Sequence, residues 1–370
     1  MLLAVSMTCI GLLASMLFII PSCVPMQQNQ THSASAAPKP IRLIFAASDP
    51  DTNFMALAQK LWATELEERT NGAVVVEFHW GGELAEMTDT LEVTQKGIAD
   101  ICNIIPPYFR DVFPIHNFED IYAYHDKPLA RIMTNQTIDD IFPEAEAEWT
   151  NAGLKRLYSM GLAQHHIGSI RPIRTLEDFE GLKIRATGKL NNAIFSSVGA
   201  RPIAFPTTEA YDQFSKGMID AELNDYDCFI RFGSCEVINY ITRLYIGANP
   251  CLTTCMNLDT WNELPLDVQQ VIMELREEFP IKYNELMKQQ YMEISIPLIK
   301  AKGIEIIDLP PEDLIALYNY PLVQGVKNGW VDALITDKPE LDPQKAGEIR
   351  DTYLQLLTDF GNKYPDTLEP

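Results

Sequence analysis

The sequence predicts an α/β protein with two domains, and three observations lead to that prediction. The chain of 370 residues is longer than one ordinary hydrophobic core supports. Apolar runs and turn residues between Ile41 and Ile105 alternate as strand, helix, strand, helix and strand. The same alternation recurs between Phe179 and Asp225. Such alternation is typical of a parallel sheet with crossover helices, so two such units indicate two α/β domains.

In the first unit, each strand ends in a loop at the same edge of the predicted sheet. Ligands of open α/β sheets bind beyond the carboxyl ends of the strands. Asp49, Glu86 and Tyr108 follow the three strands and are candidates for ligand contact, with a cap or turn role as the alternative for each. The predicted elements are strand Ile41–Ala47, helix Phe54–Arg69, strand Val74–His79, a helix from the turn at Gly81–Leu84 through Lys96, and strand Asp100–Ile105.

The rest of the chain continues with both kinds of element. Phe113–Trp149 is aromatic and acidic, and it predicts two or three short helices around the first sheet. The helical run Leu264–Lys302 would span ~60 Å if straight. The other predicted elements are a strand from Leu154 continued in Gly161–Ser169, strand Leu182–Ile184, helix Leu190–Val198, strand Pro202–Phe205, helix Tyr211–Lys216, extended segments within Tyr240–Asn257, strand Gly303–Leu309, and helices Pro311–Tyr318, Leu322–Leu334 and Pro343–Phe360.

Arg185 ends the first strand of the second unit, so it points a cation at the predicted crevice. A guanidinium donates two parallel hydrogen bonds to a carboxylate and stays charged at any working pH. The alternative is a surface arginine paired with Glu180 or Glu209.

Two stretches of the second unit carry a family resemblance: GLKIRATG at Gly181–Gly188 and VGARPIAFPTTEAYDQFSKGMIDAELN at Val198–Asn224. Together they resemble the solute-binding proteins of TRAP transporters, the DctP-like tripartite ATP-independent periplasmic systems. The resemblance covers roughly the whole mature chain, because it extends to Glu68–Ile101, Phe113–Asp126, Arg171–Arg185 and Trp261–Ile272.

The resemblance implies a two-domain type II periplasmic-binding-protein fold with a hinge and a long helix that spans both domains. We place domain I at residues 41–160 plus about 250–285, and domain II at 161–249 plus about 286–350. Residues 351–370 would form a helix end and tail, and residues 1–40 a signal segment and tether.

The resemblance also implies a ligand site in which Arg185 pairs with a carboxylate. Asn224 matches an asparagine that orients the ligand in the family. Many members carry a second arginine where this chain has Gln164 or His165, a departure that indicates a different acid or a histidine-assisted site. A histidine with a pKa near the working pH would make affinity pH-dependent, whereas a structural histidine is the alternative. Thr207 and Thr208 would line the cleft, and Phe229 would form an apolar wall or pack in the core.

The implied function is capture of a small organic acid by a monomer that closes around it. Delivery would be to the small and large TRAP membrane subunits, with no cofactor and no metal. An enzyme is disfavoured because the sequence has no G-x-S-x-G elbow, no phosphate-binding glycine loop and no metal-ligand spacing. A ligand-binding sensory or scaffold lipoprotein and a binding protein of an ATP-driven importer remain alternatives.

Charge and the amino terminus indicate where such a protein works. The net charge of −22 argues against nucleic acid, because no basic surface replaces the counterions of phosphates. The first 26 residues are apolar and uncharged and read as an export signal. Ile20–Cys23 loosely resembles a lipobox, so we expect a periplasmic or outer-face protein lipidated at Cys23; plain secretion and an uncleaved anchor are the alternatives.

Five cysteines remain beyond the signal segment, and their odd number and irregular spacing favour buried free thiols over a metal site. Bridges between Cys228 and Cys235 and between Cys251 and Cys255 are the pairings to test.

Overall fold

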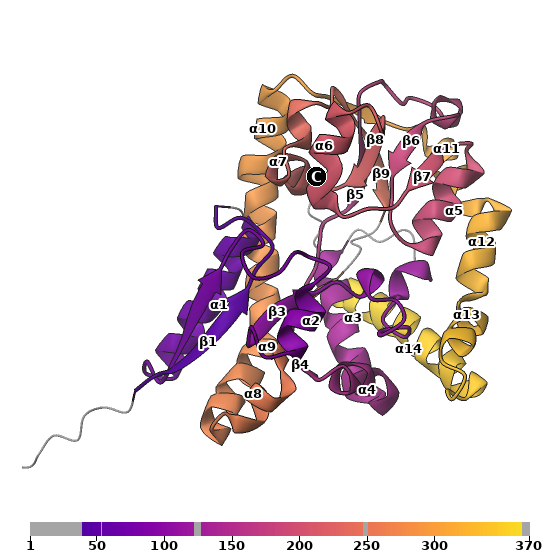
Figure 1. Cartoon of the computed structure of the whole chain (residues 1–370). Helices are drawn as coiled ribbons and strands as arrows, with labels where there is room; N and C mark the ends of the chain where they lie inside the picture. The colour runs from indigo at the N-terminus through magenta and orange to yellow at the C-terminus, as the bar shows by residue number, and fades with distance from the viewer. Residues whose placement is uncertain (1–38, 53, 122–126, 247–250, 365–370) are drawn as a thin grey trace, which may run out of the picture. The chain divides into compact units, whose positions relative to one another are not determined.

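A computed structural model describes residues 39–52, 54–121, 127–246 and 251–364, which belong to one compact unit (Figure 1). The expected export signal and Cys23 lie outside the described residues. The strands are β1 Ile41–Ala46, β2 Val74–His79, β3 Ile101–Ile104, β4 Leu154–Met160, β5 His165–Ser169, β6 Lys183–Arg185, β7 Arg201–Ile203, β8 Ala221–Asn224, β9 Tyr240–Ile246, β10 Leu252–Asn257 and β11 Glu305–Asp308.

Helices connect these strands and cover the sheets. The α-helices are α1 Phe54–Arg69, α2 Thr90–Gln95, α3 Pro128–Ile141, α4 Pro143–Asn151, α5 Lys189–Ser197, α6 Ala210–Ser215, α7 Tyr226–Arg231, α8 Leu258–Glu263, α9 Leu266–Gln289, α10 Ile296–Ala301, α11 Pro311–Asn319, α12 Pro321–Asn328, α13 Trp330–Asp337 and α14 Pro343–Lys363. Short 3₁₀ turns include η1 Pro106–Tyr108, η2 Phe118–Asp120, η3 Leu176–Phe179, η4 Thr207–Glu209 and η5 Ser234–Glu236, and η6 Gln290–Ser295 is a π-helix.

The strands form two separate mixed sheets. The order in the first sheet is β2-β1-β3-β10-β4, in which β1 runs parallel to β2 and β3 while β10 runs antiparallel to both of its neighbours. The second sheet has the order β11-β9-β5-β8-β6-β7, with β6 parallel to β7 and β8 and with β5 antiparallel to β8 and β9. The chain therefore passes from the first sheet to the second after β4 and returns to the first with β10. The predicted two-domain α/β fold is confirmed.

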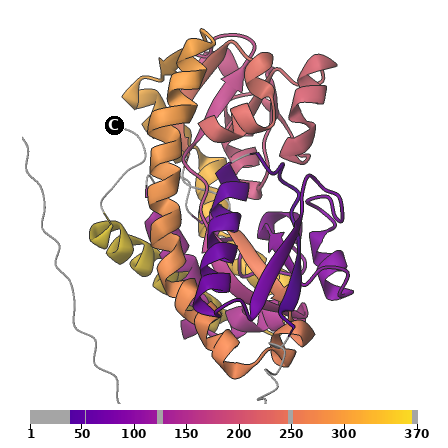
Figure 2. The same cartoon turned by 90° about the vertical axis from the view of Figure 1, so that its left-hand side faces the viewer.

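A long helical segment, from α9 through η6 to α10, packs beside both sheets. Helix α9 packs on α1 and β4 of the first sheet, and its continuation through η6 and α10 packs on α7 beside the second sheet. Figure 2 shows this segment, in orange, running past both sheets. Helix α9 continues through Pro280, and the irregular turn comes later, at η6, just before Pro297. Because proline lacks an N–H group, a widened turn before Pro297 accommodates the missing hydrogen bond.

Each sheet has its own hydrophobic core. In the first, the rings of Trp62 and Phe279 both pack on Tyr158, with ring centres 5.2 and 4.8 Å from that of the tyrosine. In the second, Ile184, Phe195 and other buried side chains pack β6 and β8 against α5 and α12. A third cluster packs α13 and α14 on α3. The exact domain bounds stay a prediction, and the last helix, α14, contacts α3 of the part predicted as domain I.

Two predicted helices were wrong in extent. Helix α2 begins at Thr90 rather than directly after the turn at Gly81–Leu84. That turn is present, held by the N–H groups of Gly81 and Gly82, which donate to the carbonyls of Asp49 and Ala47, but a further turn, closed by the N–H of Asp89 donating to the carbonyl of Glu86, precedes the helix. Both glycines also have positive φ angles, of 65° and 79°, which hold the chain in a turn. The predicted helix Leu322–Leu334 is divided at Gly329 into α12 and α13, which bury their apolar residues in different clusters.

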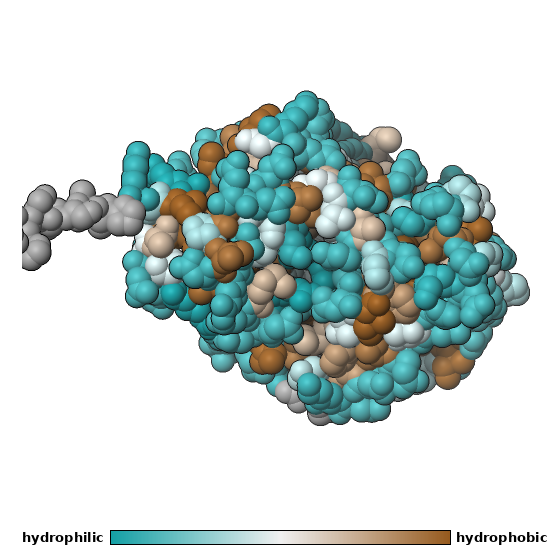
Figure 3. Space-filling model, turned by 90° about the horizontal axis from the view of Figure 1, so that it is seen from below, coloured by the Kyte–Doolittle hydropathy of each residue, from teal (hydrophilic) through white to brown (hydrophobic). Residues whose placement is uncertain are grey.

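The surface agrees with the acidic composition. In the face that Figure 3 shows, hydrophilic residues cover most of the area and hydrophobic residues are scattered between them. Among the described residues, no helix combines the length and the apolar character needed to cross a membrane.

Candidate functional site

A pocket lies where loops from both sheets meet. Its volume is about 750 Å³ including space open to solvent, and the centre of a water molecule can reach about 60 Å³ of it. The first sheet contributes loop residues such as Asp49 and Tyr108, and the second contributes the ends of β6 and β8. The walls combine apolar and polar groups: Asp49, Met87, Ile105, Pro107, Tyr108, Glu119, Leu162, His165, Arg185, Thr187, Gly188, Asn191, Thr207, Leu223, Asn224, Cys228, Arg231, Phe232 and Leu252.

Arg185 is the last residue of β6, and only 6% of it is exposed. Its Nε donates to the carbonyl of Phe205 at 3.1 Å, and its Nη1 donates to the carbonyl of Leu223 at 3.2 Å. Among the described residues no carboxylate lies within ion-pair distance of it, so the alternatives of a pair with Glu180 or Glu209 are wrong. Two carbonyls fix the guanidinium at the pocket wall while its charge stays without a direct counterion.

Glu222 lies beside Arg185 in the sheet, since the two residues are partners in the register of β6 and β8. The side chain is fully buried, and its Oε1 has no hydrogen-bond partner among the described residues. Burial raises the pKa of Glu222, which the charge of Arg185 opposes. Burial thus works against the charged form of Glu222, an acid that faces Arg185 in the register of the two strands.

Asn224 ends β8 and is 3% exposed. Its Nδ2 donates to Oγ1 of Thr207 at 2.6 Å and lies 3.4 Å from Oε2 of Glu222. These bonds hold the amide in one orientation at the pocket wall. An amide presents both a donor and an acceptor, so it can bind a carboxylate together with a neighbouring oxygen.

His165 begins β5 and lines the pocket, whereas the neighbouring Gln164 is buried and does not. Burial, opposed by Asp225 and assisted by the charge of Arg185, lowers the pKa of His165 to about 4. His165 is therefore neutral near pH 7, which disfavours the alternative in which a histidine titrates near the working pH. Its Nδ1 is buried without a hydrogen-bond partner among the described residues.

Arg231 and Asp49 connect the two sides of the pocket. Arg231 belongs to α7, beside the second sheet, and its Nη1 lies 2.7 Å from Oδ1 of Asp49 in the loop after β1. Both side chains are almost completely buried, at 7% and 3% exposure. Arg231 is thereby ion-paired with Asp49, whereas Arg185 has no ion pair with an acid of the described chain.

Asp120, next to Glu119, and the start of α5 form a second connection. The backbone N–H of Leu190 donates to Oδ1 of Asp120 at 3.1 Å. Arg110 pairs with Glu119 at 3.1 Å and also with Asp120. Burial and the neighbouring Asp120 raise the pKa of Glu119 to about 7, although Arg110 opposes them. The pocket wall thus holds one acid that is only partly ionised at neutral pH.

The family assignment follows from a comparison of the whole sequence with known families. Residues 45–320 match the model of the DctP family, described as bacterial extracellular solute-binding protein, family 7. The chain belongs to this family. Its members include the TRAP solute-binding proteins, so the predicted recognition is confirmed.

Comparisons with individual proteins support the assignment of the chain to the DctP family. A solute-binding protein of Chromohalobacter salexigens is 25% identical over 301 residues, which cover 77% of this chain and 82% of the relative. A TRAP solute-binding protein of Rhodoferax ferrireducens, solved with copurified benzoate, has a TM-score of 0.76 at 16% identity and covers 87% of this chain and 99% of its own. DctP7 of Bordetella pertussis, an extracytoplasmic solute receptor that binds pyroglutamic acid, has a TM-score of 0.70 at 16% identity, with 85% and 99% covered.

The structure brings six of the ten predicted site residues of this DctP-family protein to the pocket. These are Arg185, Asn224, His165, Thr207, Asp49 and Tyr108. Thr208 and Glu86 are exposed and do not line the pocket, whereas Met87, the residue after Glu86, does. Phe229 packs in the core against Gly168, which leaves the apolar wall to residues such as Phe232. Contact with a ligand stays a prediction for each of them.

Sequence reasoning missed three polar residues at or beside the pocket: Arg231, Glu119 and Glu222. Arg231 lies seven residues beyond Asn224, on the helix that follows the end of β8. A search of the residues that follow each strand end would have found it. Glu222 and Asn224 are two positions apart in β8, so their side chains lie on the same face of the sheet. Arg185 is the register partner of Glu222 and shares that face.

The described residues contain no group of three histidine, cysteine or acidic side chains that could hold a metal ion. The five cysteines of the described chain, Cys102, Cys228, Cys235, Cys251 and Cys255, are buried free thiols. The expectation of buried free thiols is confirmed, and neither of the two candidate bridges is formed.

Proposed function

We propose that this protein captures a small organic acid in the pocket and delivers it to the small and large membrane subunits of a TRAP transporter. The observation that carries the proposal is Arg185, a buried guanidinium that is held by two backbone carbonyls and has no carboxylate partner among the described residues. A ligand carboxylate would supply the missing counterion, and a charge-assisted pair of this kind is both strong and directional.

The charges around the pocket favour a ligand with one carboxylate. Arg231 is neutralised by Asp49, and Glu119 adds a further acid to the wall. A second carboxylate would therefore meet no unpaired cation in the part of the pocket wall that the structure describes. The remaining walls include Met87, Phe232 and Leu252, which suit a short apolar body. Relatives that bind benzoate and pyroglutamic acid support a monocarboxylate.

Asn224 and His165 would orient the ligand. The amide is fixed by Thr207, and the neutral imidazole has a buried nitrogen that can bind a hydroxyl or keto oxygen. Binding requires no covalent chemistry. A ligand that contacts both sides of the pocket stabilises the closed arrangement by its preference for that state.

A thermal-shift screen tests the proposal. We expect at least one small monocarboxylate to raise the melting temperature, because a ligand that binds only the folded chain stabilises it by mass action. Dicarboxylates of similar size should give a smaller shift. A library without a single stabilising acid would contradict the proposed ligand class, and uptake by the membrane subunits that is independent of this protein would contradict the proposed delivery.

A further inference from the structure

A second, smaller cavity lies next to the pocket and shares Pro107 and Glu119 with its wall. The centre of a water molecule can reach about 20 Å³ of it, compared with about 60 Å³ in the pocket. One water molecule needs roughly 10–15 Å³ by this measure, so the cavity has room for one or two water molecules or for a single ion of similar size. We call this cavity the Arg131 chamber, after the most unusual of its wall residues.

Arg131 projects from α3 and is 2% exposed. Its Nε and Nη1 are buried and have no hydrogen-bond partner among the described residues, and no described acid lies within ion-pair distance of it. The thiol of Cys251 lies beside the guanidinium, and Glu119 feels its charge at longer range. Its one described ring contact is with Tyr353, whose centre lies 6.0 Å from the guanidinium carbon. Burial of an unpaired cation is costly, so a counterion in the chamber would stabilise the fold.

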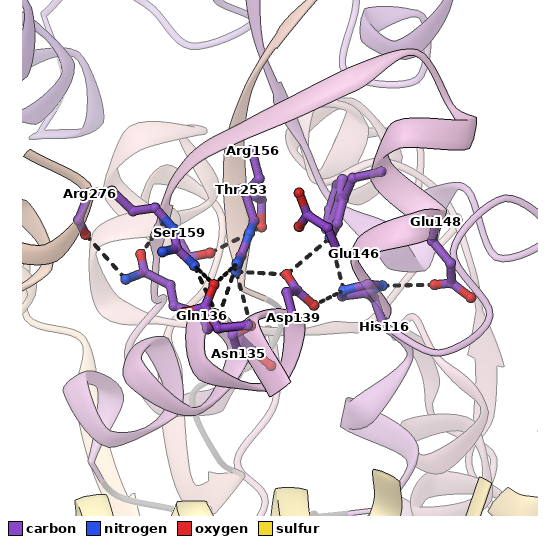
Figure 4. A network of polar contacts seen from close by, with 12 residues as sticks. His116, Asn135, Gln136, Asp139, Glu146, Glu148, Arg156, Ser159, Thr253 and Arg276 are labelled. Carbon is purple, nitrogen blue, oxygen red and sulfur yellow. Dashed lines mark hydrogen bonds and ion pairs between the residues drawn. The ribbon is translucent and has the colours of Figure 1, made fainter. Parts of the chain in front are cut away.

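The acids nearest the chamber, Asp139 and Glu119, already have partners other than Arg131. Figure 4 shows Asp139 between His116 and Arg156, with Glu148 on the far side of the imidazole. The distances are 2.7 Å from Asp139 to both His116 and Arg156, and 2.8 Å from His116 to Glu148. Glu119, in the shared wall, is paired with Arg110. The geometry therefore leaves Arg131 as the cation of the chamber that lacks an acid.

We propose that the Arg131 chamber binds a small inorganic anion, chloride, with the Arg131 guanidinium as its cationic partner. Ser159 and Thr253 line the same chamber and share a hydrogen bond of 3.3 Å between their hydroxyl groups, which leaves one of the two O–H groups free to donate to an anion. Asn135 adds a side-chain amide to the wall. The chamber is smaller than the pocket by both measures, about 20 against 60 Å³ for the centre of a water molecule and about 350 against 750 Å³ with space open to solvent, which favours a monatomic ion over the organic acid proposed for the pocket.

Crystals grown in sodium bromide test the location of the anion. Bromide replaces chloride and scatters anomalously, so we expect an anomalous peak within hydrogen-bond distance of the Arg131 guanidinium. Water alone in the chamber would overturn the proposal, and so would a carboxylate of the organic ligand that reaches Arg131.

A solution test separates a real site from an ion that binds only at crystal concentration. The melting temperature is measured in sodium chloride and, at equal ionic strength, in sodium isethionate, whose anion is too large for the chamber. An Arg185→Met background removes anion effects in the pocket. For a dissociation constant near ~10 mM, 300 mM chloride should raise the melting temperature by roughly 2–4 °C over isethionate.

Arg131→Met, of similar length and without charge, should abolish this difference. Arg201→Met, at an exposed arginine of β7, should keep it. If Arg131→Met does not fold, Arg131→Gln serves in the same measurement. Equal responses in chloride and isethionate, or a chloride response that survives the loss of Arg131, would overturn the proposal.

Discussion

Arg231 and Asp49 form a buried ion pair of 2.7 Å between α7 beside the second sheet and the loop after β1 of the first. The two residues lie 182 positions apart in the sequence. Such a pair stabilises the arrangement in which both sides of the pocket are close together. Breaking it would leave one buried charge without a partner, which is strongly destabilising for that arrangement.

Replacing Asp49 with asparagine should therefore weaken ligand binding. We expect Asp49→Asn to raise the dissociation constant at least about tenfold, mainly through faster dissociation, because related complexes differ mostly in that rate. Stopped-flow kinetics with the acid from the screen measures both rates. Asp51→Asn, in the same loop but exposed, is the matched control, and equal kinetics of the two variants would contradict the role given to the ion pair.

The hydrogen bond from Asn224 to Thr207 gives a graded prediction. Asn224→Leu removes a donor to a charged ligand and should cost about 1.5–3 kcal/mol of binding free energy. Thr207→Val only frees the amide to turn, so we expect a loss of about 0.5–1.5 kcal/mol. Calorimetry on both variants measures these losses. Thr208→Val, at the exposed neighbour, should bind like the wild type, and a larger loss for Thr208→Val than for Thr207→Val would refute the assignment.

His116 should make stability depend on pH. Burial alone would lower the pKa of His116, but Asp139 and Glu148 outweigh it and raise the pKa to about 9. The folded pKa is above the unfolded value of about 6.5, so the stabilisation is complete below pH ~6.5 and is lost as the pH rises through 9. The amount is on the order of 3 kcal/mol.

Denaturant unfolding between pH 6 and 10 measures this dependence. The wild type should lose stability across the range, and His116→Gln should lose less over the same interval, although it is less stable at pH 6. His79→Gln, at a partly exposed histidine of β2, is the control and should follow the wild type. Parallel curves for wild type and His116→Gln would show that His116 does not carry the effect.

Local patterns were sufficient to predict most elements of the fold. Helix Phe54–Arg69 and strand Val74–His79 were predicted with the bounds that the structure has, because their apolar spacing and flanking turns agree. Arg185 was placed correctly at the end of its strand for the same reason. The turn predicted at Gly81–Leu84 is present, but the helix after it starts only at Thr90, because a second turn closed by the N–H of Asp89 and the carbonyl of Glu86 comes first, and the sequence pattern gave no signal of that turn.

The site was predictable only where a strand end identified it. Arg231 pairs with Asp49 in the loop after β1, 182 positions away in the sequence, and nothing in either stretch reveals that partnership. Glu222 is fully buried because β8 is an inner strand of its sheet, a fact that depends on strand order and not on the neighbouring residues. Arg131 looks like an ordinary helix residue in the sequence, and only the packing of α3 shows that it is buried.

Calorimetric titration of Arg185→Met with the best acid from the screen tests the central claim most directly. The wild type should bind the acid, Arg201→Met should bind it equally well, and Arg185→Met should lose about 2–5 kcal/mol of binding free energy because the carboxylate loses its charge partner. An Arg185→Met variant that folds and binds the acid with wild-type affinity would contradict a carboxylate site at Arg185.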